Sequence, residues 1–184
     1  MNILAILSVI VLVLVIYVIL IYNKFITKNN LCEEGWSGIN VQLKRRYDLI
    51  PNLVSTVKGY SKHESDVLTN VIELRNKAMG ATNVEDKNNF ENQLSLGLKN
   101  LFALSESYPD LKASQNFLSL QSSLMEIEDN IQNARRYYNA TVRDFNTLVQ
   151  AFPSNIIASK FNFKQKQYFE LESNLEKSNP KVEF

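Results

Sequence analysis

The feature that most constrains this chain is a stretch of uncharged, mostly aliphatic residues at its N-terminal end. From Ile3 to Tyr22 the sequence has no charged residue, and only Ser8, Tyr17 and Tyr22 interrupt a run of Ile, Leu, Val and Ala. Twenty helical residues extend roughly 30 Å, the thickness of the hydrocarbon core of a bilayer. A cleaved signal peptide would need a basic leader and a small-residue cleavage site. Neither is present here, so the sequence predicts an uncleaved transmembrane anchor.

The basic residues beside this stretch predict its orientation. Lys24 and Lys28 follow the stretch directly, and Met1 and Asn2 before it carry no basic side chain. Because basic flanks stay in the cytoplasm, we expect the N-terminus outside and the rest of the chain inside.

The rest of the chain is long enough for one domain with a substantial core. We expect an anchor over residues 1–23, a juxtamembrane continuation over 24–35, a helical bundle over 36–170 and a polar tail over 171–184. The net charge is only +1, which gives no indication of a nucleic-acid partner.

Heptad patterns predict that this domain is all-α. Apolar residues at alternating spacings of three and four mark one long helix, as in a coiled-coil seam. That seam comprises Phe117, Leu120, Leu124, Ile127, Ile131, Ala134, Tyr138, Thr141, Phe145, Leu148 and Phe152. A second seam runs from Trp36 to Ala78 and predicts a helix that is kinked or restarted at Pro51.

Turn signals divide these helices. Gly80 to Asn83 predicts a turn, a middle helix follows with Phe90, Leu94 and Leu101 on one face, and Pro109 ends it. Beyond Pro153 we expect a short helix that packs back. The fold class is therefore an N-terminal transmembrane helix and an elongated, antiparallel up-down-up bundle with a short closing C-terminal helix.

A few polar residues fall on or beside the apolar seams. Arg46 and Glu64 stand at seam positions, with Asp48 nearby, and a second stripe lies beside the long helix's seam: Arg135, Asn139 and Asn146. Buried charges persist only when they are paired. Three interpretations remain open: an internal network that fixes helix register, a polar groove for a ligand or partner, or simple exposure.

Catalytic motifs are incomplete. His63 is the only histidine, and Val67 stands where a zinc-peptidase helix needs the second one. Ser55 and Lys58 have the spacing of a serine–lysine pair but lack its companion motifs. Glu126, Glu128 and Asp129 are best read as a solvated acidic face. We therefore predict no enzyme, no cofactor and no metal site.

Longer strings resemble a known family. They include Leu43-Lys44-Arg45-Arg46-Tyr47-Asp48-Leu49-Ile50-Pro51-Asn52-Leu53-Val54, Ser105-Glu106-Ser107-Tyr108-Pro109-Asp110-Leu111, Ala134-Arg135-Arg136-Tyr137-Tyr138-Asn139 and Phe152-Pro153-Ser154-Asn155-Ile156-Ile157-Ala158. These strings are similar to the signature of the bacterial LemA family. Asn162 departs from it, standing where the family pattern has glycine, and Lys160 is also unusual there.

This resemblance implies a single-pass membrane protein with a LemA-like bundle, and an association with membrane peptidases and envelope stress. It implies no specific chemistry. Two function classes follow: a membrane-anchored, non-enzymatic scaffold or adaptor, and a sensor that uses the polar stripe on the long helix. The expected partners are the bilayer through residues 3–22 and a membrane protein or a second copy of the chain. Nucleic acid and a small-molecule substrate are not expected.

Overall fold

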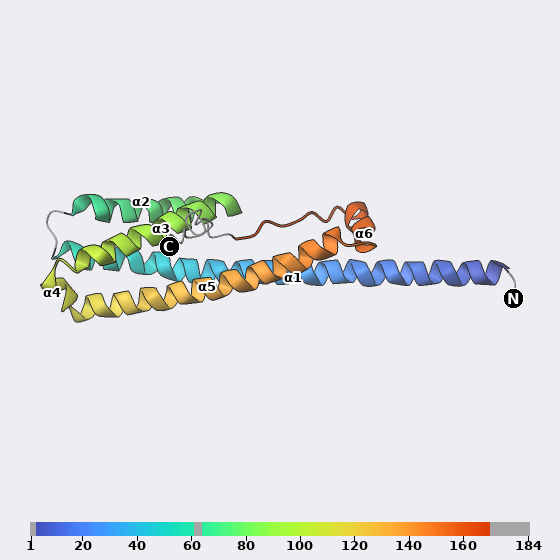
Figure 1. The fold of residues 1–184 in the computed structure, drawn as a ribbon, viewed down its shortest axis with the longest axis horizontal. Coiled ribbons are helices and arrows are strands. Elements are labelled where there is room, and N and C mark those ends of the chain that lie inside the picture. The colour runs from blue at the N-terminus through green and yellow to red at the C-terminus, as the bar shows by residue number, and fades with distance from the viewer. Residues whose placement is uncertain (1–2, 61–63, 170–184) are drawn as a thin grey trace, which may run out of the picture. The chain divides into compact units, whose positions relative to one another are not determined.

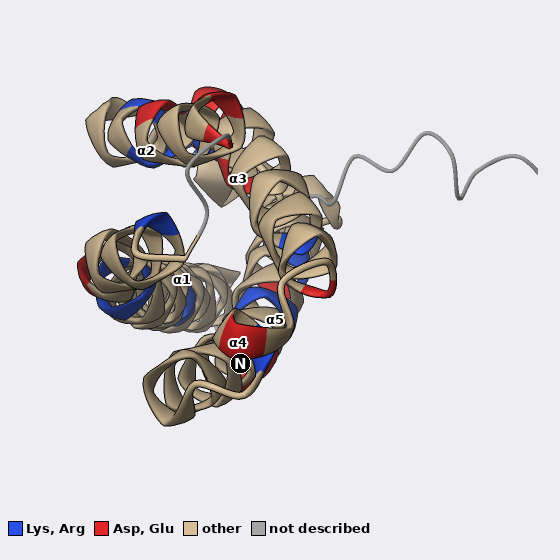
Figure 2. Cartoon of the chain, turned by 90° about the vertical axis from the view of Figure 1, so that its left-hand side faces the viewer, with Lys and Arg blue, Asp and Glu red and all other residues tan. Residues whose placement is uncertain are grey.

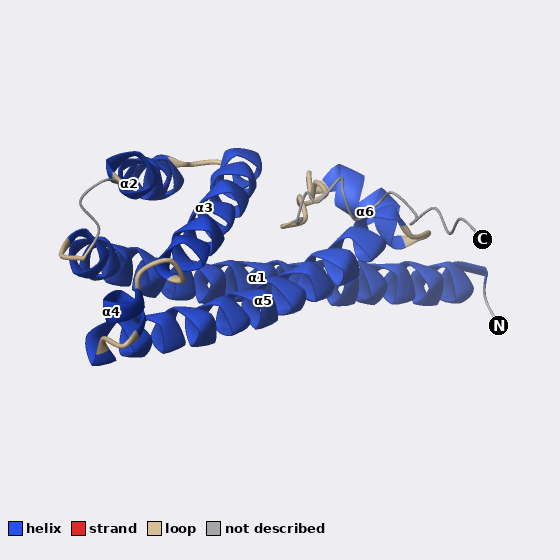
Figure 3. Cartoon of the chain, turned by 60° about the vertical axis from the view of Figure 1, so that its left-hand side comes forward, coloured by secondary structure: helices blue, strands red, loops and turns tan. Residues whose placement is uncertain are grey.

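The computed structural model describes residues 3–60 and 64–169, and the ordered elements in that part of the chain are helices (Figures 1 and 3). They are α1 (Ile3–Lys58), α2 (Ser65–Gly80), α3 (Val84–Ser105), α4 (Pro109–Lys112), α5 (Gln115–Gln150) and α6 (Ser154–Lys160). The all-α class, with a long apolar N-terminal helix, a helical bundle and a short helix after Pro153, is confirmed. Helix α1 includes a stretch that is long and apolar enough to cross a membrane, and that stretch is not buried.

The chain forms two compact units, which α1 and α5 both run through. Among the described residues, the anchor unit consists of residues 3–40 and 133–168, and the four-helix unit consists of residues 41–60, 64–132 and 169. His63 and the predicted tail over 171–184 lie outside the described residues.

In the anchor unit α1 and α5 run antiparallel, and α6 turns back beside α1 (Figure 1). The helices meet closely at Gly35, where an added Cβ would lie 3.1 Å from the Cα of Tyr138. The core of this unit contains Phe25, Cys32, Ile39, Tyr138, Val142, Phe145, Ile157 and Ala158. The ring of Phe163, beyond α6, stacks on Phe25 with centroids 4.5 Å apart.

In the four-helix unit the end of α1, then α2, α3 and the start of α5 alternate in direction around a shared interior (Figures 1 and 2). The short α4 connects α3 to α5. The buried apolar residues include Leu43, Ile50, Leu53, Val54, Val57, Leu68, Val71, Leu74, Ala78, Leu94, Leu98, Leu101, Leu111, Phe117, Leu124, Ile127, Ile131 and Phe169.

Of the two alternatives predicted at Pro51, the restart is wrong, because α1 continues through this proline to Lys58. Proline cannot donate to the carbonyl four residues earlier, which belongs to Tyr47. That carbonyl instead accepts a hydrogen bond from Nε of Arg75 on α2, at 2.7 Å. The freed acceptor is therefore satisfied from a neighbouring helix, and the helix does not have to restart.

The helix ends further along, beside Gly59. The N–H groups of Gly59 and Tyr60 bond to the carbonyls of Thr56 and Val57, at 3.2 and 3.0 Å, which tightens the last turn. Helix α2 begins at Ser65 and returns. The single helix expected up to Ala78 is thus two antiparallel helices, and the bundle is up-down-up-down instead of up-down-up. The heptad phase runs on across this break, so periodicity alone does not reveal it.

Candidate functional site

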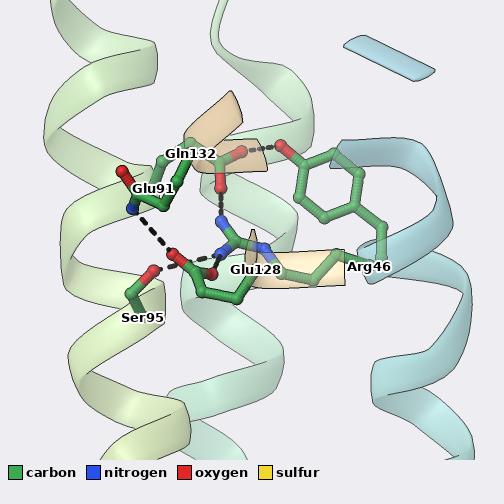
Figure 4. A network of polar contacts seen from close by, with 6 residues as sticks. Arg46, Glu91, Ser95, Glu128 and Gln132 are labelled. Atoms are coloured by element: carbon green, nitrogen blue, oxygen red, sulfur yellow. Dashed lines mark hydrogen bonds and ion pairs between the residues drawn. The ribbon is translucent and has the colours of Figure 1, made fainter. Parts of the chain in front are cut away.

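A polar cluster in the four-helix unit centres on Arg46 of α1, which is 1% exposed. Its guanidinium donates to the Glu91 carboxylate on α3 through Nη2. Its Nη1 donates to Oε2 of Glu128 on α5 at 2.6 Å and to Oγ of Ser95 at 3.0 Å. We call Arg46, Glu91, Ser95 and Glu128 the Arg46 cluster (Figure 4).

Neighbouring side chains hold both carboxylates of the cluster. The phenol of Tyr47 donates to Glu91, and Nε2 of Gln132 donates to Oε1 of Glu128 at 3.2 Å. Glu91 is completely buried, whereas the Glu128 side chain is 35% exposed. An arginine placed between two carboxylates forms charge-assisted hydrogen bonds that depend on geometry. The cluster therefore links α1, α3 and α5 at one level.

Helical spacing explains how the partners converge. Glu91 and Ser95 lie four residues apart on α3, and Glu128 and Gln132 lie four residues apart on α5, so each pair shares a helix face. Both faces are turned toward Arg46 (Figure 4).

Sequence reasoning missed Glu91 and misplaced Glu128. The buried positions of α3 are Glu91, Leu94, Gly97, Leu98, Leu101 and Ser105, and all of them except Gly97 follow a three-four heptad seam. The face chosen from the sequence began one residue earlier, at Phe90, and so left Glu91 out. The spacing of Glu91, Leu94, Leu98 and Leu101 in the sequence could have indicated that Glu91 is buried. Glu126 and Asp129 are exposed, as expected for a solvated face, whereas Glu128 is 35% exposed and bonds to Arg46.

The second predicted stripe lies in the anchor unit. Asn146 is 5% exposed, and its amide forms two bonds with the main chain of Lys166, donating to O at 2.9 Å and accepting from N at 2.8 Å. The phenol of Tyr138 donates to the carbonyl of Gln167 at 3.0 Å. These bonds fasten the extended segment after α6 to α5. Arg135 of the same stripe is buried, and Asn139 is half-buried.

The remaining predicted residues lie outside the Arg46 cluster. Asp48 is exposed on α1. Glu64 is half-buried and accepts a hydrogen bond from the phenol of Tyr108 at 3.3 Å. Desolvation, followed by the nearby Glu64 carboxylate, raises the pKa of Tyr108 above its usual value.

Two further ionisable groups of the anchor unit have shifted pKa values. Burial raises the pKa of the Cys32 thiol, although a hydrogen bond with Thr141 partly opposes this. A hydrogen bond from Lys28, 3.0 Å away, is the main cause that lowers the pKa of Asp144. Within the described ranges, groups of three or more side chains suited to hold a metal ion are absent.

Comparison with known proteins decides the family. A family model described as the LemA family matches residues 35–184. The chain belongs to the LemA family. The matched range includes the Arg46 cluster and the bonded pair of Asn146 and Lys166, and the resemblance seen in the sequence strings is confirmed.

Curated relatives of this LemA-family chain come from different bacteria. Magnetosome protein MamQ 2 of Paramagnetospirillum magneticum (strain ATCC 700264 / AMB-1) is 25% identical over 175 residues, covering 81% of this chain and 64% of the relative. Protein LemA of Metamycoplasma hominis is 27% identical over 144 residues, covering 76% and 64%. Magnetosome protein MamQ of Magnetospirillum gryphiswaldense is 24% identical over 174 residues, covering 80% and 64%. The chain thus spans less than two thirds of the length of these relatives.

Proposed function

We propose that this LemA-family protein is a membrane-anchored, non-enzymatic scaffold or adaptor. Residues 3–22 cross the bilayer, and the helices that follow are presented on the cytoplasmic side. Their partner is a membrane protein or a second copy of the chain. The family resemblance suggests membrane protein quality control or the envelope stress response as its setting.

The observation that carries this proposal is how the buried polar groups are used. In the four-helix unit the Arg46 guanidinium bonds to two carboxylates and a hydroxyl of neighbouring helices. A general acid or base has to reach a substrate proton, and a nucleophile needs an adjacent base. The guanidinium and the two carboxylates bond to each other, and this supports a structural role for them.

The anchor supports the membrane location. Its aliphatic side chains are exposed along the described N-terminal stretch, including Leu4 at 80% and Leu12 at 59%. A continuous exposed aliphatic helix is stable in lipid, where its backbone groups bond internally. Lys24 and Lys28 after the stretch favour the cytoplasmic side for the remainder.

The alternative function is a sensor that binds a ligand along Arg135, Asn139 and Asn146. It has less support, because the donor and the acceptor of the Asn146 amide are both bonded to the main chain of Lys166. A ligand at this position would have to displace the segment after α6.

Cross-linking in the native cells tests the adaptor proposal. The full-length chain is cross-linked, solubilised gently and purified, and its covalent partners are identified by mass spectrometry. A chain reduced to residues 1–30 controls for capture by the anchor, and a chain with residues 3–22 replaced by an unrelated transmembrane helix controls for capture by the helical units. The proposal expects one recurrent membrane protein, or the chain itself, with the full-length and helix-swapped chains only.

Two outcomes would contradict the proposal. Equal recovery of the same partners by residues 1–30 would assign the interaction to the anchor. Recovery of the monomer alone, from a folded chain and with an active cross-linker, would favour the sensor.

A further inference from the structure

Helix α6 and its flanking turns place large apolar side chains on the surface of the anchor unit. Phe152 is 81% exposed, Ile156 is 60% exposed and Phe161 is 48% exposed. Ile157 and Ala158, on the opposite side of α6, are buried and hold the helix in place. We call the exposed side chains of residues 152–164 the α6 foot. Single exposed apolar residues are common on protein surfaces, so exposure alone does not indicate a binding surface.

The α6 foot lies beside the end of the apolar stretch of α1. The ring of Phe161 contacts the ring of Tyr22, with centroids 4.9 Å apart, and Phe163 is 5.9 Å from the same ring. Tyr22 is the last residue of the uncharged stretch, and Lys24 is the first charge after it. Tyrosine is enriched where a helix leaves the hydrocarbon. The foot therefore lies level with the end of the apolar stretch, and α1 extends beyond it toward the N-terminus (Figure 1).

The charges around the foot favour lipid over protein as the occupant. Residues 145–169 contain Lys160, Lys164 and Lys166 but no Asp or Glu, and residues 1–32 contain Lys24 and Lys28 but no Asp or Glu. The adjacent acid, Asp144, is bonded to Lys28 at 3.0 Å. Exposed aromatic and aliphatic side chains with an excess of lysines are the composition of segments that lie in the interface of an anionic bilayer.

We propose that the α6 foot is a second, interfacial membrane contact of this chain. Phe152, Ile156 and Phe161 insert between lipid headgroups, and Lys160 and Lys164 contact anionic lipid phosphates. This inference rests on the anchor proposed above. A segment this short would bind weakly on its own, but the anchor keeps it at the surface, so its effective concentration there is high. Two contacts, unlike one, also restrict rotation of the anchor unit about the axis of α1.

Tryptophan quenching by lipids with brominated acyl chains tests the contact in the full-length chain. Trp36 is the only tryptophan and is replaced by Phe, which keeps a ring against Tyr138. Single reporters are then introduced as Phe152→Trp and Ile156→Trp. Each protein is reconstituted in vesicles of phosphatidylcholine with phosphatidylglycerol, and circular dichroism verifies its helix content.

Two control reporters are measured in the same way. Leu12→Trp, inside the apolar stretch, reports whether the anchor spans the bilayer. Tyr137→Trp replaces another exposed aromatic residue, 46% exposed, on the same unit. Its ring lies 3.3 Å from the Cβ position built on Gly35, which is 13 residues past Tyr22 or roughly 20 Å along α1.

The expected result is strong quenching of Leu12→Trp and at least about twofold more quenching of both foot reporters than of Tyr137→Trp, because quenching requires contact with acyl chains. Omission of phosphatidylglycerol should reduce quenching of the foot reporters only. Equal quenching of the foot reporters and Tyr137→Trp, with Leu12→Trp quenched, overturns the foot and leaves the anchor intact. An unquenched Leu12→Trp overturns the anchor itself. If the emission of the foot reporters were blue-shifted but unquenched, and if the shift depended on protein concentration, the occupant would be a second copy of the chain. That result would overturn the lipid assignment.

Discussion

Arg46 occupies a position where the heptad pattern of α1 calls for an apolar side chain, and it is nevertheless almost completely buried. Removing a charge from water costs several kcal/mol, and only well-placed partners offset this cost. Its partners come from α3 and α5, far away in sequence. We therefore expect this residue to contribute more to which helices pair, and at what level, than to stability relative to an apolar core.

Truncation of Arg46 should strongly reduce the stability of the protein. Arg46→Ala leaves the buried Glu91 carboxylate without its cation, so we expect a loss on the order of 3 to 5 kcal/mol in the free energy of unfolding. Arg45→Ala is the matched control, because Arg45 is exposed and bonds only weakly to Gln42 at 3.3 Å among the contacts described. That change should remain within about 0.5 kcal/mol. Urea unfolding of the full chain in detergent measures both, and equal stabilities would refute a structural role for the cluster.

Asn162 ends α6 with an unusual backbone conformation. Its φ is 60°, and the N–H groups of Asn162 and Phe163 bond to the carbonyls of Ser159 and Ala158, at 3.3 and 2.9 Å. This is a Schellman motif, which favours glycine and accepts asparagine. Asparagine at this position is therefore compatible with the helix end that the glycine implied by the resemblance would form.

The positive φ of Asn162 leads to a specific prediction about substitutions at this position. Asn162→Val should lose about 1 to 2 kcal/mol of stability, because a β-branched residue is strained at positive φ. Asn162→Gly should stay within about 1 kcal/mol of the original chain, because glycine adopts this conformation freely but makes the unfolded chain more flexible. Urea unfolding distinguishes the two variants. If valine were tolerated as well as glycine, the left-handed conformation would not be required.

At the scale of helices, α1 and α2 compensate for a proline. Pro51 removes one backbone donor, and Arg75 supplies a replacement to the Tyr47 carbonyl. An unsatisfied buried acceptor costs about 1 to 3 kcal/mol. The two residues should therefore be energetically coupled even though they do not bond to each other.

A double-mutant cycle measures this coupling. Arg75→Met in the original chain should cost about 1 to 3 kcal/mol, because the Tyr47 carbonyl loses its donor. In a Pro51→Ala background the new N–H bonds to the same carbonyl, so the same change should cost at least about 1 kcal/mol less. Unfolding free energies of the four chains give the result. Equal costs in both backgrounds would show that Arg75 acts independently of the proline.

These helices also show which features periodicity predicts. The α5 seam placed Phe117, Ile131 and Phe145 in the core, where they are buried. Phe152, at the end of the same seam, is exposed because α5 ends at Gln150. The Tyr47 carbonyl that Pro51 leaves free is bonded by an arginine 28 residues after Tyr47 in the sequence. Rules based on periodicity and on neighbouring residues cannot identify Arg75 as a partner of the Tyr47 carbonyl. For the same reason they did not identify Glu91 as a partner of Arg46.

For the whole molecule, the proposed adaptor role depends on the side of the membrane on which the helical units lie. The lysines after the uncharged stretch favour the cytoplasm. A single reactive cysteine on the four-helix unit can test this. Ser122 is exposed on α5, whereas Cys32 is 1% exposed and burial raises its thiol pKa, so it reacts slowly. Cys32→Ser removes the remaining background and keeps a hydroxyl for the bond with Thr141.

In that background, Ser122→Cys should resist a membrane-impermeant maleimide in intact cells and react after lysis. A permeant maleimide, applied to intact cells, should label it and serves as the accessibility control. Because the reagent differs only in its ability to cross the bilayer, protection reports the side of the membrane and not local burial. Full labelling of intact cells by the impermeant reagent would place the four-helix unit outside. The adaptor would then have to be sought among partners on that side, and the lysine flank would be overridden by another determinant of topology.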